Sequence, residues 1–225
     1  MKTDIKNKIT AEIQTADFFN NLPAEISSYT LKKIFAEDGD KFFYFSYDNE
    51  KLHRSFAAYF HEETFEYKVR VKIGLNEFCL TKFFCNKLET FIELLNAEIK
   101  TALENLSAFV DTKSDFLIAE KHFDTWEYPQ TLPKNLEDFE LFITPKNPVK
   151  ITNGSYIILN YSNFDKNCDL TIYYNVYTDN FGGENKINLV PNVSYLFDAD
   201  NLKDLEAKLR KNLQIELQSI KNFSM

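Results

Sequence analysis

The 225-residue sequence is poor in the residues on which common catalytic and binding motifs depend. It has only five glycines, so backbone loops that cradle phosphate groups are not expected. It has three histidines, and none of the familiar nucleotide-binding, hydrolase, zinc-protease or calcium-loop motifs is present. We therefore predict a protein that is not an enzyme, with no catalytic residue, no metal site and no cofactor.

Cysteine and long apolar runs are also scarce. The three cysteines, Cys79, Cys85 and Cys168, are odd in number and form no CxxC pair, so we expect free buried thiols rather than disulfides. No stretch approaches the roughly 18 apolar residues of a membrane span, and the N-terminus lacks the apolar segment of a signal peptide. We expect a cytoplasmic protein with no membrane contact. The abundance of Lys, Asn, Ile and Phe is typical of AT-rich microbial genomes and predicts a bacterial protein.

Basic residues are outnumbered by acidic ones, 26 to 34, which gives a net charge of −8. Nucleic-acid binding depends largely on neutralising phosphates with Lys and Arg, so DNA and RNA are not expected as main partners. An acidic surface favours a basic protein partner instead. Aromatic residues make up 16% of the chain, so many rings are buried in a core or presented to a partner.

Two segments carry apolar residues with the spacing of one helix face. The first stripe consists of Leu88, Phe91, Leu95, Ile99, Leu103 and Leu106. The second consists of Leu202, Leu205, Leu209, Leu213, Leu217 and Ile220, each 114 positions after its counterpart. We predict two long amphipathic helices related by this offset. Asn86 with Glu89, and Asn201 with its acidic neighbours Asp198, Asp200 and Asp204, are suited to cap them.

The offset of 114 also relates residues outside the helices. It pairs Tyr47 with Tyr161, Tyr59 with Tyr173, Thr64 with Thr178, Ile73 with Ile187, and Asn21-Leu22 with Asn135-Leu136. One ungapped register then covers about 18–106 and 132–220, which predicts an internal duplication. The alternative is that two unrelated halves are in phase by chance.

These patterns predict an α+β fold. We expect a tandem duplication of an antiparallel β-meander of four to five strands, each followed by one long amphipathic helix, with a short leading helix. The predicted bounds are 1–106 for the first unit, 107–131 for a packed connector and 132–225 for the second unit, and the two units can also pack as one domain. Turns are expected at Asp38-Gly39, Gly182-Gly183 and Pro191-Asn192.

Two strands lack the alternation of polar and apolar residues that a half-covered antiparallel sheet shows. They contain Phe42-Phe43-Tyr44-Phe45 and Tyr156-Ile157-Ile158-Leu159, again 114 positions apart. We expect both faces of the sheet to be covered here. A helix supplies one cover, and the other is the second unit, a second subunit in a homodimer, or a partner.

One charged strand face is the main candidate for binding. Lys68, Arg70 and Lys72 alternate with apolar residues along a strand, and Arg54 is expected to join them. They are candidates for contact with an anionic group or an acidic partner. The alternative is a solvated face neutralised by cross-strand Glu side chains. The positions 114 residues later, Gly182, Glu184 and Lys186, do not keep the stripe.

Two histidine segments contain residue types that can bind metal ions. His61-Glu62-Glu63 and His122-Phe123-Asp124 could each supply two ligands, but neither has a third at a recognisable spacing. We expect these histidines, and His53, to lie in turns or on the surface.

Small size, acidic charge, aromatic richness and the lack of catalytic motifs favour a non-catalytic protein-interaction protein, such as an inhibitor, an immunity protein or a chaperone-like protein. The alternative is a small-ligand-binding protein with an aromatic-lined pocket between sheet and helix. A nucleic-acid binder and an enzyme with an unmarked site are the remaining hypotheses.

Overall fold

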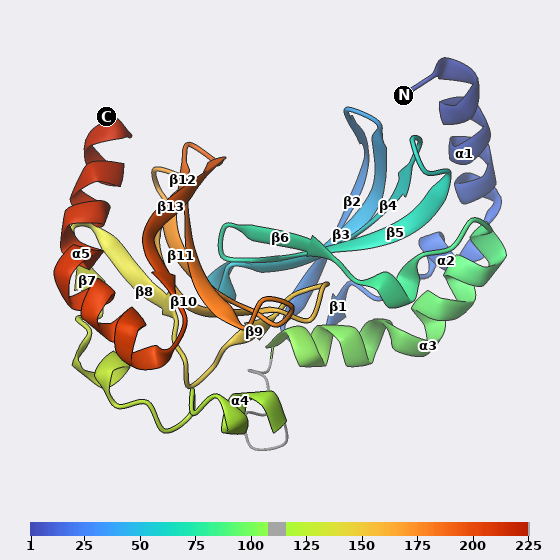
Figure 1. Cartoon of the computed structure of the whole chain (residues 1–225). Helices are drawn as coiled ribbons and strands as arrows, with labels where there is room; N and C mark the ends of the chain where they lie inside the picture. Colours follow the sequence, from blue (N-terminus) through green and yellow to red (C-terminus); the bar gives the residue numbers. More distant parts are fainter. Residues whose placement is uncertain (108–115, 225) are drawn as a thin grey trace. The chain divides into compact units, whose positions relative to one another are not determined.

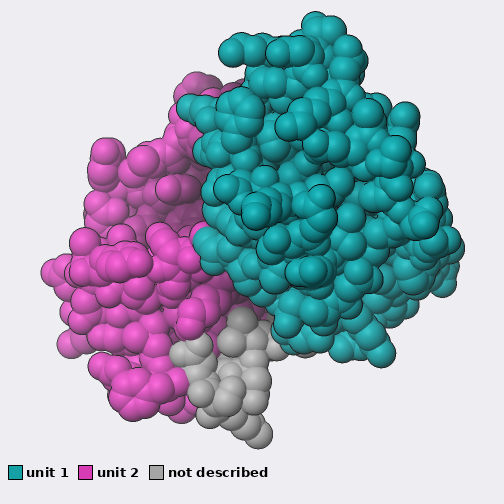
Figure 2. Space-filling model, turned by 90° about the vertical axis from the view of Figure 1, so that its right-hand side faces the viewer, with its two compact units in different colours: residues 1–108 teal, residues 109–225 magenta. Residues whose placement is uncertain are grey.

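The computed structural model describes residues 1–107 and 116–224. The chain divides into two compact units, 1–108 and 109–225 (Figure 2), referred to below as unit 1 and unit 2. Each unit has its own antiparallel sheet and its own long helix (Figure 1). The predicted α+β fold is therefore confirmed. Part of the connector predicted over 107–131 lies outside the described residues.

Unit 1 begins with α1 (Thr3–Thr15) and α2 (Asp17–Asn20) and ends with the long helix α3 (Leu88–Ser107). Its strands are β1 (Glu25–Ile26), β2 (Tyr29–Asp38), β3 (Lys41–Asn49), β4 (Arg54–His61), β5 (Glu66–Ile73) and β6 (Asn76–Cys79). They pair in chain order from β1 to β6, each antiparallel to the next. The sheet is thus the predicted meander, and α1 and α3 lie on one of its faces (Figure 1).

Unit 2 begins with α4 (Phe116–Glu120) among its described residues and ends with the long helix α5 (Leu202–Phe223). Its strands are β7 (Asn135–Leu136), β8 (Phe139–Ile143), β9 (Val149–Lys150), β10 (Tyr156–Asn163), β11 (Cys168–Asn175), β12 (Asn180–Ile187) and β13 (Val190–Ala199). The sheet order is β7-β8-β10-β11-β12-β13, and β9 adds to one end of β10. Without β9, this is the order found in unit 1, so the predicted duplication is confirmed in the topology.

The register of the duplication differs from the predicted one in its first part. The hydroxyl of Tyr47 donates to the carbonyl of Pro23, and that of Tyr161 donates to the carbonyl of Pro133, each at 2.7 Å. The tyrosines are 114 residues apart, but the prolines are 110 apart, so four residues are inserted between them in unit 2. They lie in the longer connection from β8 to β10, which contains β9.

This insertion makes the predicted pairing of Asn21-Leu22 with Asn135-Leu136 wrong. Asn135-Leu136 forms β7, whose structural counterpart is β1, Glu25–Ile26. Leu22-Pro23 corresponds instead to Leu132-Pro133, at an offset of 110. From β3 and β10 onward the predicted offset of 114 holds, as the side chains of Asn49 and Asn163 show. Each accepts a hydrogen bond at 3.0 Å from the backbone N–H three residues later.

The two long helices bury the predicted stripes. In α3 every predicted residue from Phe91 to Leu106 is buried, and in α5 the same holds from Leu205 to Ile220. The side chain of Asn201 caps α5 by accepting the Asp204 N–H at 3.0 Å, as predicted. Helix α3 begins at Leu88, two residues after the predicted start at Asn86.

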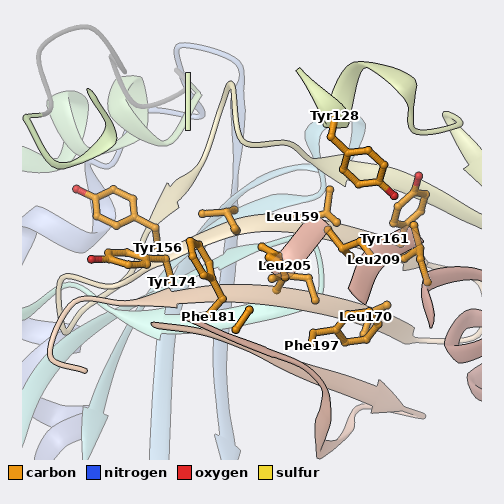
Figure 3. Close-up of a cluster of buried hydrophobic side chains, with 14 of the residues drawn as sticks. Tyr128, Tyr156, Leu159, Tyr161, Leu170, Tyr174, Phe181, Phe197, Leu205 and Leu209 are labelled. Carbon is orange, nitrogen blue, oxygen red and sulfur yellow. The ribbon is translucent and has the colours of Figure 1, made fainter. Parts of the chain in front are cut away.

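The core of unit 2 lies between the sheet and α5. Figure 3 shows Tyr156, Tyr174 and Phe181 from three neighbouring strands, together with Leu205 and Leu209 from α5. The segment before β7 also contributes to this core, and its members are Ile118, Phe123, Trp126 and Tyr128. Part of the predicted connector is therefore an integral layer of unit 2.

A β-bulge explains why two strands lack alternation. The β3–β4 register shifts between Phe43 and Phe45, and the β10–β11 register shifts between Ile157 and Leu159. A bulge places consecutive side chains on the same face. In β10, Tyr156, Ile158 and Leu159 belong to the core beneath α5, and Ile157 does not. The apolar run therefore serves mainly one face, so it gives less support to a covering subunit than the sequence pattern suggested.

Two predicted turns in unit 2 are wrong. Gly182-Gly183 lies within β12, and Pro191-Asn192 lies within β13. A Cβ on Gly183 would lie 2.8 Å from the Ser194 carbonyl oxygen and 2.8 Å from the Phe197 ring, so glycine is needed there for packing. The turn between β12 and β13 is formed by Asn188 and Leu189, whose φ angles are both positive, 53° and 66°.

Candidate functional site

The strand register separates Arg54 from the other three residues of the predicted basic stripe. Arg54 is opposite Ile73, whereas the neighbouring Ser55 is opposite Lys72. Because side chains alternate between faces, Lys68, Arg70 and Lys72 share one face of the sheet and Arg54 points to the other. The structure thus brings three of the four candidate residues together.

Arg54 lies under α3. Its side chain is buried, with 8% exposed, and its Nη1 donates a hydrogen bond to the carbonyl oxygen of Leu106 in the last turn of the helix. Burial lowers the pKa of the guanidinium. Helix C-termini carry unpaired carbonyl groups and partial negative charge, so this cation stabilises the end of α3.

The remaining stripe is paired with neighbouring acids. Lys68 Nζ lies 2.8 Å from Glu66 Oε2 and also donates to Thr64 Oγ1 at 2.8 Å. Arg70 Nη1 lies 3.0 Å from Glu77 Oε2, and its guanidinium stacks over the Phe43 ring at 4.7 Å. Lys72 is half-buried and stands opposite Glu77 in the register of β5 and β6. Glu66 on the same strand and Glu77 on the neighbouring strand therefore offset much of the positive charge.

The corresponding face of unit 2 carries a buried acid. Asp169 is fully buried and its Oδ2 lies 3.2 Å from Lys186 Nζ and 3.4 Å from Asn160 Nδ2. Burial raises the pKa of this carboxyl, although the ion pair with Lys186 and the hydrogen bond from Asn160 oppose the shift. Asn160 also donates to Thr171 Oγ1 at 2.8 Å. The two units thus share a polar face but place different charges on it.

One group of side chains has the ligand types of a metal site. His61 Nε2 lies 2.8 Å from Asp40 Oδ2 and 4.0 Å from Glu63 Oε2, and one ligand atom from each residue falls within 4.8 Å of the others. Asp40, in the turn between β2 and β3, is the third residue that the sequence did not reveal. Two carboxylates and a histidine are a known ligand set for divalent transition metals.

The hydrogen bonds around His61 do not fit a metal ion. The Lys68 ammonium lies 3.2 Å from His61 Nδ1, and an ammonium can only donate, so Nδ1 accepts and the ring proton sits on Nε2. That proton is donated to Asp40, and a metal would have to displace it. A metal-bound Nε2 would also place a proton on Nδ1, facing the Lys68 cation. The group is therefore better described as a hydrogen-bonded cluster at the end of β4.

A groove of about 660 Å³ lies in unit 1 between α1, the strand ends and the start of α3. Its apolar walls are formed by Ile5 and Ile9 of α1, Phe60 and Phe65 near the β4–β5 turn, and Leu88 and Ile92 of α3. Ala16, between α1 and α2, lines it as well. This is the kind of aromatic-lined hollow between sheet and helix that the alternative hypothesis predicted.

The groove is also lined by polar side chains. The hydroxyl of Tyr67 donates to Glu12 Oε2 at 3.0 Å, and both residues line the groove. The nearby hydroxyl of Tyr44 is buried and has no hydrogen-bond partner among the described residues. Burial raises the pKa of Tyr44, and the neighbouring Tyr67 and Glu12 raise it further. The groove therefore combines apolar walls with hydrogen-bonding groups.

Unit 2 has a smaller hollow of about 460 Å³ between the segment before β7 and the start of α5. It is lined by polar and aromatic side chains that bond to one another. Trp126 Nε1 donates to Glu206 Oε2 at 3.1 Å, Arg210 donates twice to Glu206 Oε1, and Arg210 stacks over the Tyr128 ring at 4.4 Å. These contacts fasten the segment before β7 to α5.

Another candidate interaction surface is the outer edge of β13, the last strand in the sheet order of unit 2. Its exposed apolar side chains, called the β13 edge below, are Leu189, Val190, Val193, Tyr195 and Leu196. Tyr195 is 77% exposed. No strand pairs with this side of β13 within the part of the chain that the structure describes.

Comparison with protein-family models, with curated proteins and with solved structures gave no significant match. Among the described residues, no helix combines the length and apolar character needed to cross a membrane. Fold and surface define the protein as a tandem α+β protein in which each unit is a six-stranded meander, with β9 added in unit 2, covered by a long helix.

Sequence reasoning raised an aromatic-lined pocket as an alternative but did not locate the groove, and it missed the β13 edge. The groove gathers residues from α1, from the β4–β5 turn and from α3, so no short motif marks it. The β13 edge did leave a signal, because residues 187–197 contain no charged side chain. The turn predicted at Pro191-Asn192 divides this uncharged run into two segments, so the sequence pattern does not indicate one continuous exposed strand.

Proposed function

We propose that this is a non-catalytic protein-interaction protein that binds a partner protein through the β13 edge. The observation that carries the proposal is an edge strand that exposes apolar side chains and has no charged residue from 187 to 197, in a chain of which 27% of residues are charged. Exposed apolar patches of this kind are typical of protein-interaction sites. We further propose that the protein acts in the cytoplasm.

Natural proteins usually protect an edge strand with charged residues, because a bare edge invites pairing with other chains. Unit 1 follows this rule. Glu77 is exposed on its edge strand β6, and Lys82, in the short 3-10 helix that follows, is exposed and pairs with Glu98 at 2.9 Å. At the positions of Cys79, Thr81 and Lys82, unit 2 has Val193, Tyr195 and Leu196. Unit 2 lacks charged residues at these edge positions, so we expect unit 2 to bind the partner protein.

The partner is expected to contact side chains more than backbone. Pro191 lacks an N–H, and the β12–β13 register shifts after Ser194, so little regular backbone is open for an added strand. Tyr195 is then the central anchor, since tyrosine is enriched among the residues that dominate interface energies. The net charge of −8 favours a basic surface around the apolar centre of the partner.

The test compares Tyr195→Lys with Thr81→Lys, the matched change at the exposed equivalent position in unit 1, in the short 3-10 helix after β6. Partners captured from the native host by the wild-type chain are identified by mass spectrometry, purified and measured for affinity. We expect Tyr195→Lys to weaken binding by about 30-fold or more, since interface anchors are worth about 2 kcal/mol or more. Thr81→Lys should leave the affinity unchanged.

Sedimentation of the purified chain separates a partner protein from a second copy. If the wild-type chain is a homodimer and Tyr195→Lys dissociates it, the β13 edge binds a second copy of this chain and not a different protein. Equal affinities for both variants, or no captured protein that responds to Tyr195→Lys, would contradict the proposal.

A second candidate function is small-ligand binding, which the groove of unit 1 favours through its volume and its aromatic walls. Titration of unit 1 with small aromatic and aliphatic compounds, followed by NMR, tests this function.

A further inference from the structure

The two units differ at one position that decides the shape of their hollows. Leu22-Pro23 is equivalent to Leu132-Pro133 at an offset of 110. The residues just before each proline align at the same offset without a gap, so Ala16 corresponds to Trp126. On the long helices, where the offset is 114, Leu88 corresponds to Leu202. Both hollows lie between these paired elements.

In unit 2 the indole of Trp126 occupies this place. The side chain is 9% exposed, belongs to the core of the unit, and donates its N–H to Glu206. An indole suits such a site because its apolar ring is buried while its single donor reaches a carboxylate. Unit 2 therefore carries its own aromatic anchor in the crevice beside the long helix.

In unit 1 the same place is open. Ala16 presents a methyl group where unit 2 has an indole, and Ile92 stands at the position of Glu206. The resulting groove of about 660 Å³ keeps apolar walls, and two carboxylates, Glu12 and Glu89, line it. The carboxylate that accepts an indole N–H in unit 2 thus has counterparts in the groove of unit 1, on α1 and on α3.

We propose that the groove of unit 1 binds a tryptophan side chain of a partner protein, in the place that Trp126 fills within unit 2. The internal duplicate shows which group fits between the leading segment and the long helix. The groove is larger than one ring, so residues next to the tryptophan fit along Ile5 and Ile9 of α1. This inference rests on the proposed protein-interaction function but uses a different surface from the β13 edge.

The probe is N-acetyl-tryptophanamide, titrated into the full ¹⁵N-labelled chain and followed by NMR. We expect saturable shift changes at the amides of Ala16, Leu88 and Ile92. Ala16→Trp should abolish these changes, because the introduced indole fills the groove from within. It should also raise the thermal midpoint of unit 1 by roughly 4 °C or more, as a gain of about 1 kcal/mol would in a domain of this size.

The matched control is Ala11→Trp, which places an indole on the exposed side of α1, outside the groove lining. It should bind the probe as the wild type does. Ile92→Trp fills the groove from the α3 wall and keeps the test valid if Ala16→Trp does not fold. Absence of saturable binding by the wild type, or equal binding by the wild type and a folded groove-filling variant, would overturn the inference.

A reciprocal variant extends the test to the other unit. Trp126→Ala opens the equivalent crevice in unit 2, and the probe should then produce new shift changes near Leu202 that the wild type lacks. If the wild-type groove does not take the probe while Tyr195→Lys still abolishes partner binding, this inference fails and the proposed function stands. If the groove takes the probe but no partner protein is bound, the proposed function fails, and with it the partner-protein part of this inference.

Discussion

The two units keep the same backbone framework and differ in what fills and surrounds it. The tyrosine-to-proline hydrogen bonds, the asparagine caps and the bulges recur at equivalent places in both. The differences lie at the polar sheet face, the edge strand and the crevice beside the long helix. Interactions that hold the fold were thus retained after duplication, while the surfaces able to contact other molecules diverged.

The largest effects should come from the shared helix–sheet cores. Leu95→Ala in α3 and Leu209→Ala in α5 truncate equivalent, fully buried side chains. Each should lower the free energy of unfolding of its own unit by about 2–5 kcal/mol, through lost burial and the cavity left behind. Urea denaturation combined with amide hydrogen exchange measures the loss in each unit. Losses that differ by more than a factor of two would break the equivalence of the two cores.

A smaller effect is expected where the units require different residues. Gly183 in unit 2 corresponds to Val69 in unit 1, and only Gly183 faces a backbone oxygen too close for a Cβ. Gly183→Ala should therefore destabilise unit 2 by about 1–3 kcal/mol, as other overpacked sites do. Thermal unfolding of the variant checks this. A stabilised Gly183→Ala variant would show that β13 can move away from β12, and the packing explanation for this glycine would be wrong.

The leucine stripes, the strand order and the duplication could be predicted from the sequence, because helical and strand periodicities are local properties. The bulges could not, because Tyr44 and Ile158 are apolar whichever face they point to. The four-residue insertion before β10 was also hidden, since chance identities such as Asn21-Leu22 with Asn135-Leu136 kept one ungapped register plausible.

The sites were harder to predict than the fold. The pairing of Ala16 with Trp126 becomes visible only with the offset of 110, which depends on hydrogen bonds to Pro23 and Pro133. The sequence groups Arg54 with the basic stripe because it does not show the strand register that turns Arg54 to the opposite face. Charge alone could not show that the helix end formed by Leu106 is its partner.

The recurring tyrosine hydrogen bond gives a matched pair of smaller changes. Tyr47→Phe and Tyr161→Phe each remove a hydroxyl that donates to a proline carbonyl at 2.7 Å. Each should cost its unit about 0.5–1.5 kcal/mol, the usual net worth of such a bond. Chemical denaturation of the two variants measures the pair. A negligible loss in one unit would show that the bond from β3 to the segment before β1, or from β10 to the segment before β7, stabilises that unit less than its counterpart stabilises the other.

The smallest effect is a pH dependence that only unit 2 should show. Burial raises the pKa of Asp169 above the ordinary value of 3.8, so the folded chain binds this proton more tightly than the unfolded chain does. The stability of the wild type relative to Asp169→Asn should therefore fall as the pH rises from about 4 through the folded-state pKa. Unfolding of both proteins between pH 3 and pH 8 measures this difference. The equivalent residue in unit 1 is Ser55, which does not titrate, so amide exchange in unit 1 should show no matching change. If the stability of the wild type relative to Asp169→Asn instead increases with rising pH, the ion pair with Lys186 outweighs the burial of Asp169.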